Sequence, residues 1–383
     1  MPDGSTTLHS TSHVRTANAV QLVRLLRDRG PMSRAELVRA SGLTKPTVMA
    51  IVKSLLEDGI AVEAGTGPAQ ERGGRPGSLV SFNSRARTAA AVQFGPSFEV
   101  AHVTATGELL DRVVRPISAD PDELLGRSID EIRRMATSLG SIALAAPGFI
   151  DHHVGTVTYP AFGWDRIPMQ AVLEREFGVP VGLISLPSAE VVGEVIAGAA
   201  AGRDDAVVIF LAHGIGAGIL SRGRLVVGAG GAVGELGHCP VGSGLLCTCG
   251  RTGCLETVAA GWAIGAEAAR ADPKLARARL AELEGLHDPR VDAVLERAAD
   301  ALGAATAWLT NLLDPSIVVL ADTPYVHGAD AFFAAVERAA RAHAVGAELE
   351  IVRGTQDARL RGTVQRALEL LPQLLRPRRT VCG

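Results

Sequence analysis

Four side chains with metal-binding atoms lie close together in one short stretch of the sequence, residues 235–256. They are one imidazole and three thiols: His238, Cys247, Cys249 and Cys254. Glycine-rich segments separate them, and glycine lets the backbone bend so that all four can reach one point. Four cysteine and histidine ligands complete the tetrahedral shell of Zn²⁺ and leave no open position. The spacing therefore predicts a structural zinc site and not a hydrolytic one.

Two other roles for these cysteines are small buried side chains and disulfide bonds. Burial alone rarely produces the spacing Cys-x-Cys-Gly-x-x-Gly-Cys. Disulfide bonds fit poorly, because only Cys239 and Cys382 lie outside the cluster among five cysteines. A chain of this kind without a signal peptide is typical of a reducing compartment. We therefore expect a cytoplasmic protein that associates with the nucleoid when it is bound to DNA.

Length and composition indicate a globular protein of two or three domains. The chain has 383 residues, of which 47% are hydrophobic and only 4% aromatic, and this suits closely packed α/β layers. The best candidate for a membrane span, residues 191–201, is short and contains Glu194. We expect no membrane partner.

The net charge of -3 is unevenly distributed along the chain. Residues 1–90 contain 12 Lys and Arg against 7 Asp and Glu, which leaves 26 against 34 for the remainder. A basic N-terminal part on an acidic body favours contact with a polyanion. A solvated surface with randomly placed charge is the alternative.

The N-terminal part has the periodicity of three short helices. Residues 1–13 are polar without periodicity and are predicted to be a disordered tail. A first helix ends near Gly30, and Ser33 with Glu36 forms a capping box that opens a second helix, Arg34 to Ala40. A Ser-Gly-Leu turn follows, and Thr44 then caps a third helix that ends at Gly59.

Two short helices joined by a glycine turn predict a helix-turn-helix, whose second helix contacts base edges with its N-terminal residues. The apolar stripe of the third helix contains Val48, Ile51, Val52, Leu55 and Leu56. We expect its opposite face to bind double-stranded DNA through Thr44, Lys45, Thr47, Met49 and Lys53.

A β-wing is predicted after the third helix. Strand-like segments at 60–64 and 78–82 flank a loop with Arg72 and Arg75 in a glycine- and proline-rich frame. Arginine on such a loop suits a narrow minor groove, where the negative potential is enhanced. A generic helical bundle is the alternative, since helix-turn-helix periodicity is common.

The zinc stretch resembles the signature of the ROK family, which comprises repressors, open reading frames and sugar kinases. The resemblance rests on Glu-Leu-Gly-His, on Cys-Thr-Cys-Gly-Arg-Thr-Gly-Cys and on the Leu-Glu that follows, and Ala-Pro-Gly-x-x-Asp at 146–151 extends it. It implies an α/β protein, with an N-terminal winged helix domain followed by a two-lobed actin-like ATPase fold. The implied boundaries are 14–84 for the DNA-binding domain and 88–383 for the effector domain. Its first lobe covers about 88–190 plus the C-terminal helix, and its second lobe about 191–358 with the zinc site.

The resemblance also implies an effector site. In the family, zinc holds a loop against the sugar pocket, and two glutamates and the histidine bind sugar hydroxyls. These roles fall on Glu235, His238 and Glu256, and Gly148 would lie near the sugar. Imidazole has two nitrogens, so His238 can hold zinc with one and a hydroxyl with the other.

The kinase elements of the family do not match. Where the first phosphate turn reads Asp-x-Gly-Gly-Thr, residues 93–97 read Gln-Phe-Gly-Pro-Ser, and Leu186 stands at the position of the catalytic base. The adenosine glycines expected after Leu320 are replaced by Ala-Asp-Thr-Pro. A glycine turn at 213–218 is similar to a second phosphate loop, although a tight hairpin explains it equally well.

Further helices are expected at 121–139, 171–177, 262–270, 275–284, 291–312 and 360–371, with the last packing back on the first lobe.

The helix-turn-helix, the zinc stretch and the missing kinase elements together predict a transcriptional regulator of sugar-related genes, a repressor without phosphotransfer that is no enzyme. It would bind a palindromic operator as a homodimer or homotetramer and respond to a sugar, a sugar phosphate or a protein partner. One alternative is an ATP-dependent sugar kinase with a DNA-binding appendage, which nucleotide binding would reveal. Another is a DNA-binding or scaffold protein without a ligand, whose melting temperature no sugar would shift.

Overall fold

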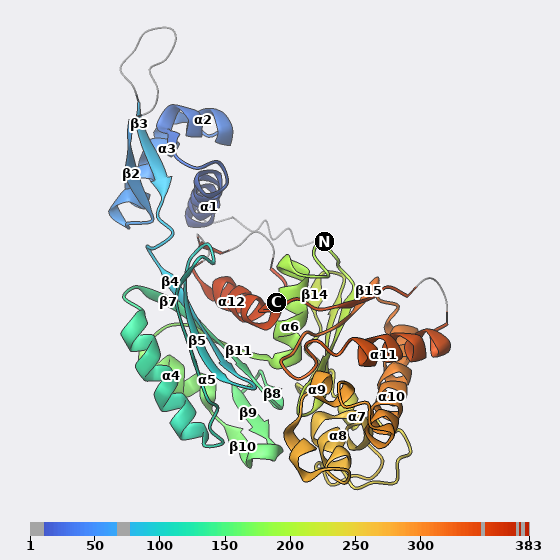
Figure 1. Cartoon of the computed structure of the whole chain (residues 1–383). Helices are drawn as coiled ribbons and strands as arrows, with labels where there is room; N and C mark the ends of the chain where they lie inside the picture. Colours follow the sequence, from blue (N-terminus) through green and yellow to red (C-terminus); the bar gives the residue numbers. More distant parts are fainter. Residues whose placement is uncertain (1–10, 67–76, 346–348, 373–374, 377–379, 383) are drawn as a thin grey trace, which may run out of the picture.

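Three parts follow one another along the chain: a small N-terminal unit and two α/β lobes, with the last helix returning to the first lobe (Figure 1). The computed structural model describes residues 11–66, 77–345, 349–372, 375–376 and 380–382, and side chains from residue 14 onward. Within these ranges, no helix is both long and apolar enough to cross a bilayer.

The N-terminal unit packs three helices against a sheet with the strand order β1-β3-β2. Its elements are α1 (Thr11–Arg29), β1 (Met32–Ser33), α2 (Arg34–Ser41), α3 (Lys45–Glu57), β2 (Ala61–Thr66) and β3 (Ser78–Phe82). The predicted capping box is confirmed, since Ser33 Oγ accepts a hydrogen bond from Glu36 N and Glu36 Oε2 accepts one from Ser33 N. The helix α1 begins at Thr11, inside the segment 1–13 that was predicted to be a disordered tail. Extending a formed helix costs little, and residues 11–13 contain no glycine or proline.

The first lobe is built on a five-stranded sheet with the order β11-β7-β4-β5-β6. Its elements are β4 (Thr88–Phe94), β5 (Phe98–Thr104), β6 (Leu109–Arg115), α4 (Pro121–Met135), β7 (Leu139–Ala146), α5 (Met169–Phe177) and β11 (Val181–Ser185), and a small sheet is formed by β8 (Phe149–Asp151), β9 (Thr156–Tyr159) and β10 (Trp164–Ile167). Every residue of β4 is buried, as expected of a central strand covered on both faces.

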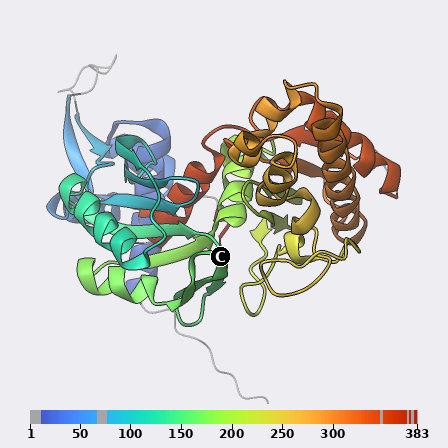
Figure 2. The same cartoon turned by 60° about the horizontal axis from the view of Figure 1, so that its bottom comes forward.

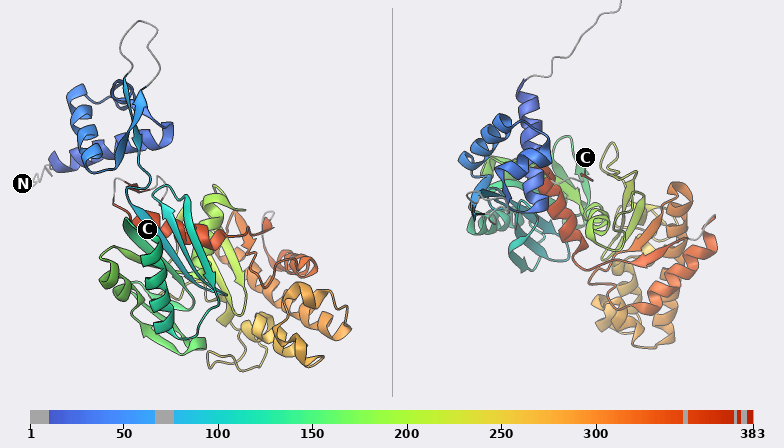
Figure 3. Two further views of the ribbon diagram at one scale, coloured as in Figure 1. Left: turned by 60° about the vertical axis from the view of Figure 1, so that its left-hand side comes forward. Right: turned by 90° about the horizontal axis from the view of Figure 1, so that it is seen from above.

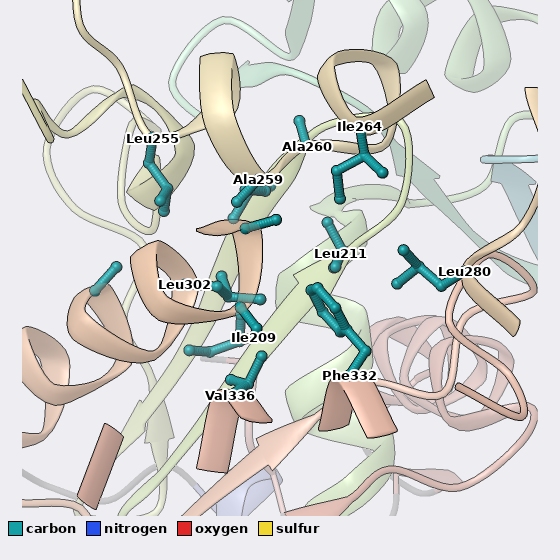
Figure 4. Packing of buried hydrophobic residues seen from close by; sticks show 14 of the residues in the cluster. Ile209, Leu211, Leu255, Ala259, Ala260, Ile264, Leu280, Leu302, Phe332 and Val336 are labelled. Carbon is teal, nitrogen blue, oxygen red and sulfur yellow. The ribbon is translucent and has the colours of Figure 1, made fainter. Parts of the chain in front are cut away.

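The second lobe repeats this plan with the strand order β14-β13-β12-β15-β16. Its elements are β12 (Ala206–Leu211), β13 (Ile215–Ser221), β14 (Arg224–Leu225), α7 (Glu256–Ala259), α8 (Gly261–Ala268), α9 (Leu280–Glu284), α10 (Pro289–Leu313), β15 (Ile317–Leu320), α11 (Asp330–His343) and β16 (Ile351–Arg353). Ile209 and Leu211 of β12 pack against Leu302 of α10 and Val336 of α11 (Figure 4). The other face of this sheet packs against α6 (Leu186–Ala197).

The helices α6 and α12 (Ala358–Leu370) lie together between the two lobes (Figure 2). Their close contact depends on one glycine from each helix. A Cβ on Gly193 would lie 1.7 Å from the carbonyl oxygen of Ala358, and a Cβ on Gly362 would lie 1.8 Å from that of Ala189. The helix α12 also packs on β4, β7 and β11, as predicted for the last helix.

The N-terminal unit sits on the end of the first lobe (Figure 3). Arg27 donates hydrogen bonds to the carbonyl oxygens of Leu375 at 2.7 Å and Arg376 at 3.1 Å. Its guanidinium lies 5.0 Å from the ring centroid of Phe82, which with Ile60 packs against the apolar cluster at the end of α12. The residues after α12 therefore join the N-terminal unit to the first lobe.

Two predicted helices differ in the structure. The helix predicted over 121–139 ends at Met135, because Leu139 already begins the buried strand β7. The helix predicted over 275–284 is divided into a 3₁₀ turn, Pro273–Arg277, and α9. The chain is extended between them, and Leu280 N donates to the carbonyl oxygen of Tyr325. The elements α11 and β16 were not predicted.

Candidate functional site

The four predicted metal ligands converge in the structure. The ligand atoms of His238, Cys247, Cys249 and Cys254 all lie within 4.8 Å of one another. The distance from Cys247 Sγ to His238 Nδ1 is 3.7 Å, and that from Cys249 Sγ to Cys254 Sγ is also 3.7 Å. A tetrahedral ion with Zn–S bonds of about 2.3 Å separates its sulfurs by roughly 3.8 Å. The cluster is compatible with zinc.

The thiols of the cluster would lose their protons on binding a metal, because thiolate is the form that ligates. Burial raises the pKa of Cys254 to about 12, so metal binding there would release a proton. The other ring nitrogen of His238, Nε2, lies 3.8 Å from Glu235 Oε2. The imidazole thus stands between the thiols and a carboxylate, an arrangement that orients histidine ligands of metals.

A cavity of about 450 Å³ lies beside this loop, between the two lobes. Glu235 and Glu256 are part of its wall, whereas Gly148 and His238 are not among the described residues that line it. Glu256 Oε1 accepts a hydrogen bond from Ile215 N at 2.9 Å, and Oε2 accepts one from Trp262 Nε1 at 3.4 Å. Burial, and then the charge of Glu256, raise the pKa of Glu235 to about 7. The cavity therefore has one acidic end.

The glycines predicted near ligands lie against close neighbours. At Gly148, with φ +77°, a Cβ would lie 2.3 Å from the carbonyl oxygen of Thr158. In the 213–218 turn, a Cβ on Gly214 would lie 2.5 Å from Glu256 Oε1 of α7, and one on Gly218 would lie 2.0 Å from the carbonyl oxygen of Pro187 of α6. Close packing of this turn against α6 and α7 accounts for these two glycines, and the contact of Gly148 with an effector stays a prediction.

A second cleft of about 370 Å³ is lined by Gln93, Glu190 and Arg359, among others. Gln93 Oε1 accepts a hydrogen bond from Arg359 Nε at 3.0 Å, and Gln93 Nε2 donates one to Thr363 Oγ1 at 3.2 Å. Beside them, Glu190 is only 4% exposed, and burial raises its pKa to about 7 against the attraction of Arg359. Arg359 thus takes a place next to the turn where the family positions phosphate.

The predicted DNA-contacting face of α3 is open to solvent. Thr44 is its N-cap residue but makes no side-chain capping hydrogen bond, and its Oγ1 lies 2.8 Å from Oγ1 of Thr47. Lys45 and Met49 are exposed, the latter by 43%. The ammonium group of Lys53 lies 3.7 Å from Glu57. Arg72 and Arg75 lie outside the described residues.

Three residues that line these cavities were not predicted as site residues: Glu190, Tyr325 and Arg359. Glu190 lies one helical turn after Leu186, the residue at the position of the family's catalytic base. Its place beside that position was therefore predictable from the sequence. Tyr325 directly follows the Ala-Asp-Thr-Pro stretch that replaces the adenosine glycines, and that departure was the available signal. Arg359 gave none, because 266 residues separate it from Gln93.

The fold and sites define a class of protein, one in which a helix-turn-helix unit is joined to a two-lobed sensor or kinase domain. Comparison with known proteins agrees. The model of the ROK family matches residues 91–361, and that of the IclR helix-turn-helix domain matches residues 16–65.

The xylose repressor of Bacillus subtilis is 27% identical over 317 residues, which cover 80% of this chain and 82% of the repressor. A glucokinase of Halalkalibacterium halodurans is 30% identical over 253 residues, 59% of this chain and 77% of that enzyme. A solved structure of a ROK family transcriptional regulator, a homolog of the E. coli MLC protein, matches with a TM-score of 0.73 and 26% identity over 95% of this chain and 98% of that one. The chain belongs to the ROK family. Its relatives include both repressors and kinases.

Proposed function

We propose that this protein is a DNA-binding transcriptional repressor whose ROK domain senses a sugar-class molecule and transfers no phosphate. The observation that carries the proposal is that one chain contains both a solvent-exposed recognition helix, α3, and a ROK domain with Leu186 in place of the catalytic base. Residues 14–84 form the DNA-binding domain in this proposal, and residues 88–383 form the effector domain, which assembles as a homodimer or homotetramer.

The DNA-binding part is tested by selecting genomic fragments that the full chain retains and by measuring operator affinity. Loss of one base contact costs about 1–3 kcal/mol for each site. Lys45→Ala and Thr47→Ala should weaken binding by this amount, and Arg75→Ala should weaken binding to sites with a narrow minor groove. Arg127→Ala, on α4 of the first lobe, is the matched control. Unchanged affinity in all three variants would contradict the proposed docking.

We also propose that His238, Cys247, Cys249 and Cys254 hold one structural Zn²⁺ in each chain. The mutual distances of the four ligand atoms and their cysteine and histidine chemistry support this. Through His238 the ion would fix the position of Glu235, and the metal would take no part in a reaction.

The absence of kinase activity is tested directly. A sugar hydroxyl that attacks the γ-phosphate needs a carboxylate to orient it and accept its proton, a contribution of roughly 10²- to 10⁴-fold. Leu186 cannot supply it, and Gln93 with Arg359 leaves no carboxylate at the first turn. Pure protein should not phosphorylate glucose or N-acetylmannosamine with ATP, and Leu186→Asp should stay inactive. ATP-dependent turnover by the parent would establish the kinase alternative.

A further inference from the structure

The segments that depart from the kinase pattern of the family meet in one place. Each of them contributes apolar side chains to the 450 Å³ cavity that also contains the two glutamates. The turn at 93–97, the start of α6 and the loop after β15 supply Phe94, Pro96, Leu186, Pro187, Pro324 and Tyr325. The space in which a kinase would bring sugar and phosphate together therefore has apolar walls in this protein.

The lining of this cavity combines acidic and apolar side chains. Glu235 belongs to the loop that contains the metal-ligand cluster, and Glu256 begins α7, whose last residue, Ala259, lies in the core (Figure 4). Leu186 of α6 and Phe210 of β12 contribute apolar side chains to the same wall. Carboxylates accept hydrogen bonds from hydroxyl groups, whereas the apolar side chains gain free energy when apolar surface covers them.

The charges of the wall disfavour a phosphate group. Among the described residues that line the cavity there are two acidic side chains and one imidazole, that of His213, and neither lysine nor arginine. The guanidinium of Arg359 is close, but it bonds to Gln93 and lies 5.7 Å from the ring centroid of Phe210. A sugar phosphate would bring its negative charge toward Glu235 and Glu256 with no lysine or arginine facing it.

Tyr325 adds an aromatic ring to the lining. The ring approaches Gly261 so closely that a Cβ there would lie 3.0 Å from Tyr325 Cζ. Its hydroxyl is buried and has no hydrogen-bond partner among the described residues. A ligand in the cavity would therefore meet the ring of Tyr325 and not its hydroxyl.

We propose that the effector is a glycoside in which a sugar ring carries an aromatic or otherwise apolar aglycone. Its ring hydroxyls would bond to Glu235 and Glu256, and its aglycone would lie between Leu186, Phe210 and Tyr325. This rests on the proposed function, since it names the ligand class of the sensing domain.

The test compares ligands that differ only in the aglycone. Calorimetry on the full chain would use phenyl and methyl β-glycosides of glucose, galactose and xylose, together with the free sugars and glucose 6-phosphate. In at least one pair the phenyl glycoside should bind roughly tenfold to a hundredfold tighter than its methyl partner, because it buries more apolar surface. Equal binding within every pair, tighter binding of a free sugar or of glucose 6-phosphate, or no binding at millimolar concentration would overturn the proposal.

Two variants test the apolar and the acidic side chains of the cavity separately. Leu186→Asn should remove most of the advantage of the phenyl glycoside, whereas Glu256→Gln should weaken both members of a pair. Leu109→Ala, an exposed position on β6, is the control. A Leu186→Asn variant that keeps the full advantage would contradict the assignment of the aglycone. Operator affinity, measured on the same samples, tests the proposed function separately: loss of DNA binding with retained glycoside preference would reject the regulator and keep the ligand.

Discussion

The space between the lobes has two sides that match the ROK family to different degrees: the side of the metal-ligand loop, which we call the zinc end, and the side of the 93–97 turn and the start of α6. At the zinc end, Glu256 is held by Ile215 N and Glu235 lies beside His238, so the groups that recognise hydroxyls in the family are present and positioned. At the other end, which we call the nucleotide end, Gln93 and Leu186 occupy positions that by resemblance carry carboxylates in the kinases of the family, and Arg359 lies beside the 93–97 turn. In the proposed function, recognition of a ligand and transfer of phosphate depend on separate residues, so that one set can be lost while the other is kept.

The largest effect is expected at the zinc end. Cys249→Ser should lose the metal and lower the melting temperature of the second lobe, because structural zinc contributes several kcal/mol to folding. Metal analysis and thermal unfolding measure this. Cys239→Ser is the matched control, since Cys239 lies outside the ligand cluster and should keep the metal. Equal zinc content in the two variants would end the assignment.

The next effect concerns the contact between the helices α6 and α12, which lie between the two lobes. Gly193→Ala should destabilise the protein by more than about 3 kcal/mol, because the added Cβ would meet the Ala358 carbonyl at 1.7 Å and neither backbone can move freely. Gly126→Ala on α4 is the control. No heavy atom lies within 4 Å of a Cβ there, so the change should stabilise the helix by about 0.5–1 kcal/mol. Urea unfolding that ranks the two variants alike would disprove the close contact.

At the nucleotide end, stability should depend on pH through Glu190. Burial raises its pKa from 4.5 to about 7, against attraction by Arg359 and Arg361 and with repulsion by Glu194 and Asp322. The folded protein therefore keeps this proton up to about pH 7, and the unfolded chain releases it near 4.5.

Because unfolding releases that proton between these values, this carboxyl makes stability fall as the pH rises from about 4.5 to 7. Glu190→Gln should therefore stabilise the protein at pH 8 by up to about 3 kcal/mol and change it little at pH 4. Chemical denaturation at the two pH values measures the difference. A gain that is the same at both would show that the carboxyl of Glu190 is not the titrating group.

The smallest effect is expected from Gln93→Glu. The substitution places a carboxylate beside Arg359 Nε, and the attraction is largely offset by desolvation, so stability should change by less than about 1 kcal/mol. ATP binding should not return, since Pro96 and the residues after Leu320 also depart from the family pattern. Calorimetry with millimolar Mg-ATP checks this. A binding signal would show that the charge at residue 93 alone decides whether the protein binds ATP.

The sequence predicted best those features that depend on neighbours along the chain. The capping box of Ser33 and Glu36 and the stripe of α3 follow from spacing within one helix, and the metal cluster follows from one loop. The division of the predicted 275–284 helix could not be predicted in this way, because Leu280 N donates its hydrogen bond to the carbonyl oxygen of Tyr325, which is distant in the sequence. The pairing of Gln93 with Arg359 depends likewise on the whole fold. The helix α11 was predictable, since its buried Phe332, Val336 and Ala340 recur every four residues.

The return of α12 to the first lobe has a consequence for synthesis on the ribosome. One face of the β11-β7-β4 region is covered only when α12 packs on it, and the seat of Arg27 forms only when Leu375 and Arg376 have emerged. The DNA-binding unit can fold early around its own core, but it acquires a fixed orientation only after residues 375 and 376 have left the ribosome. Before that point, nascent chains should carry a folded DNA-binding unit that is not docked on the first lobe.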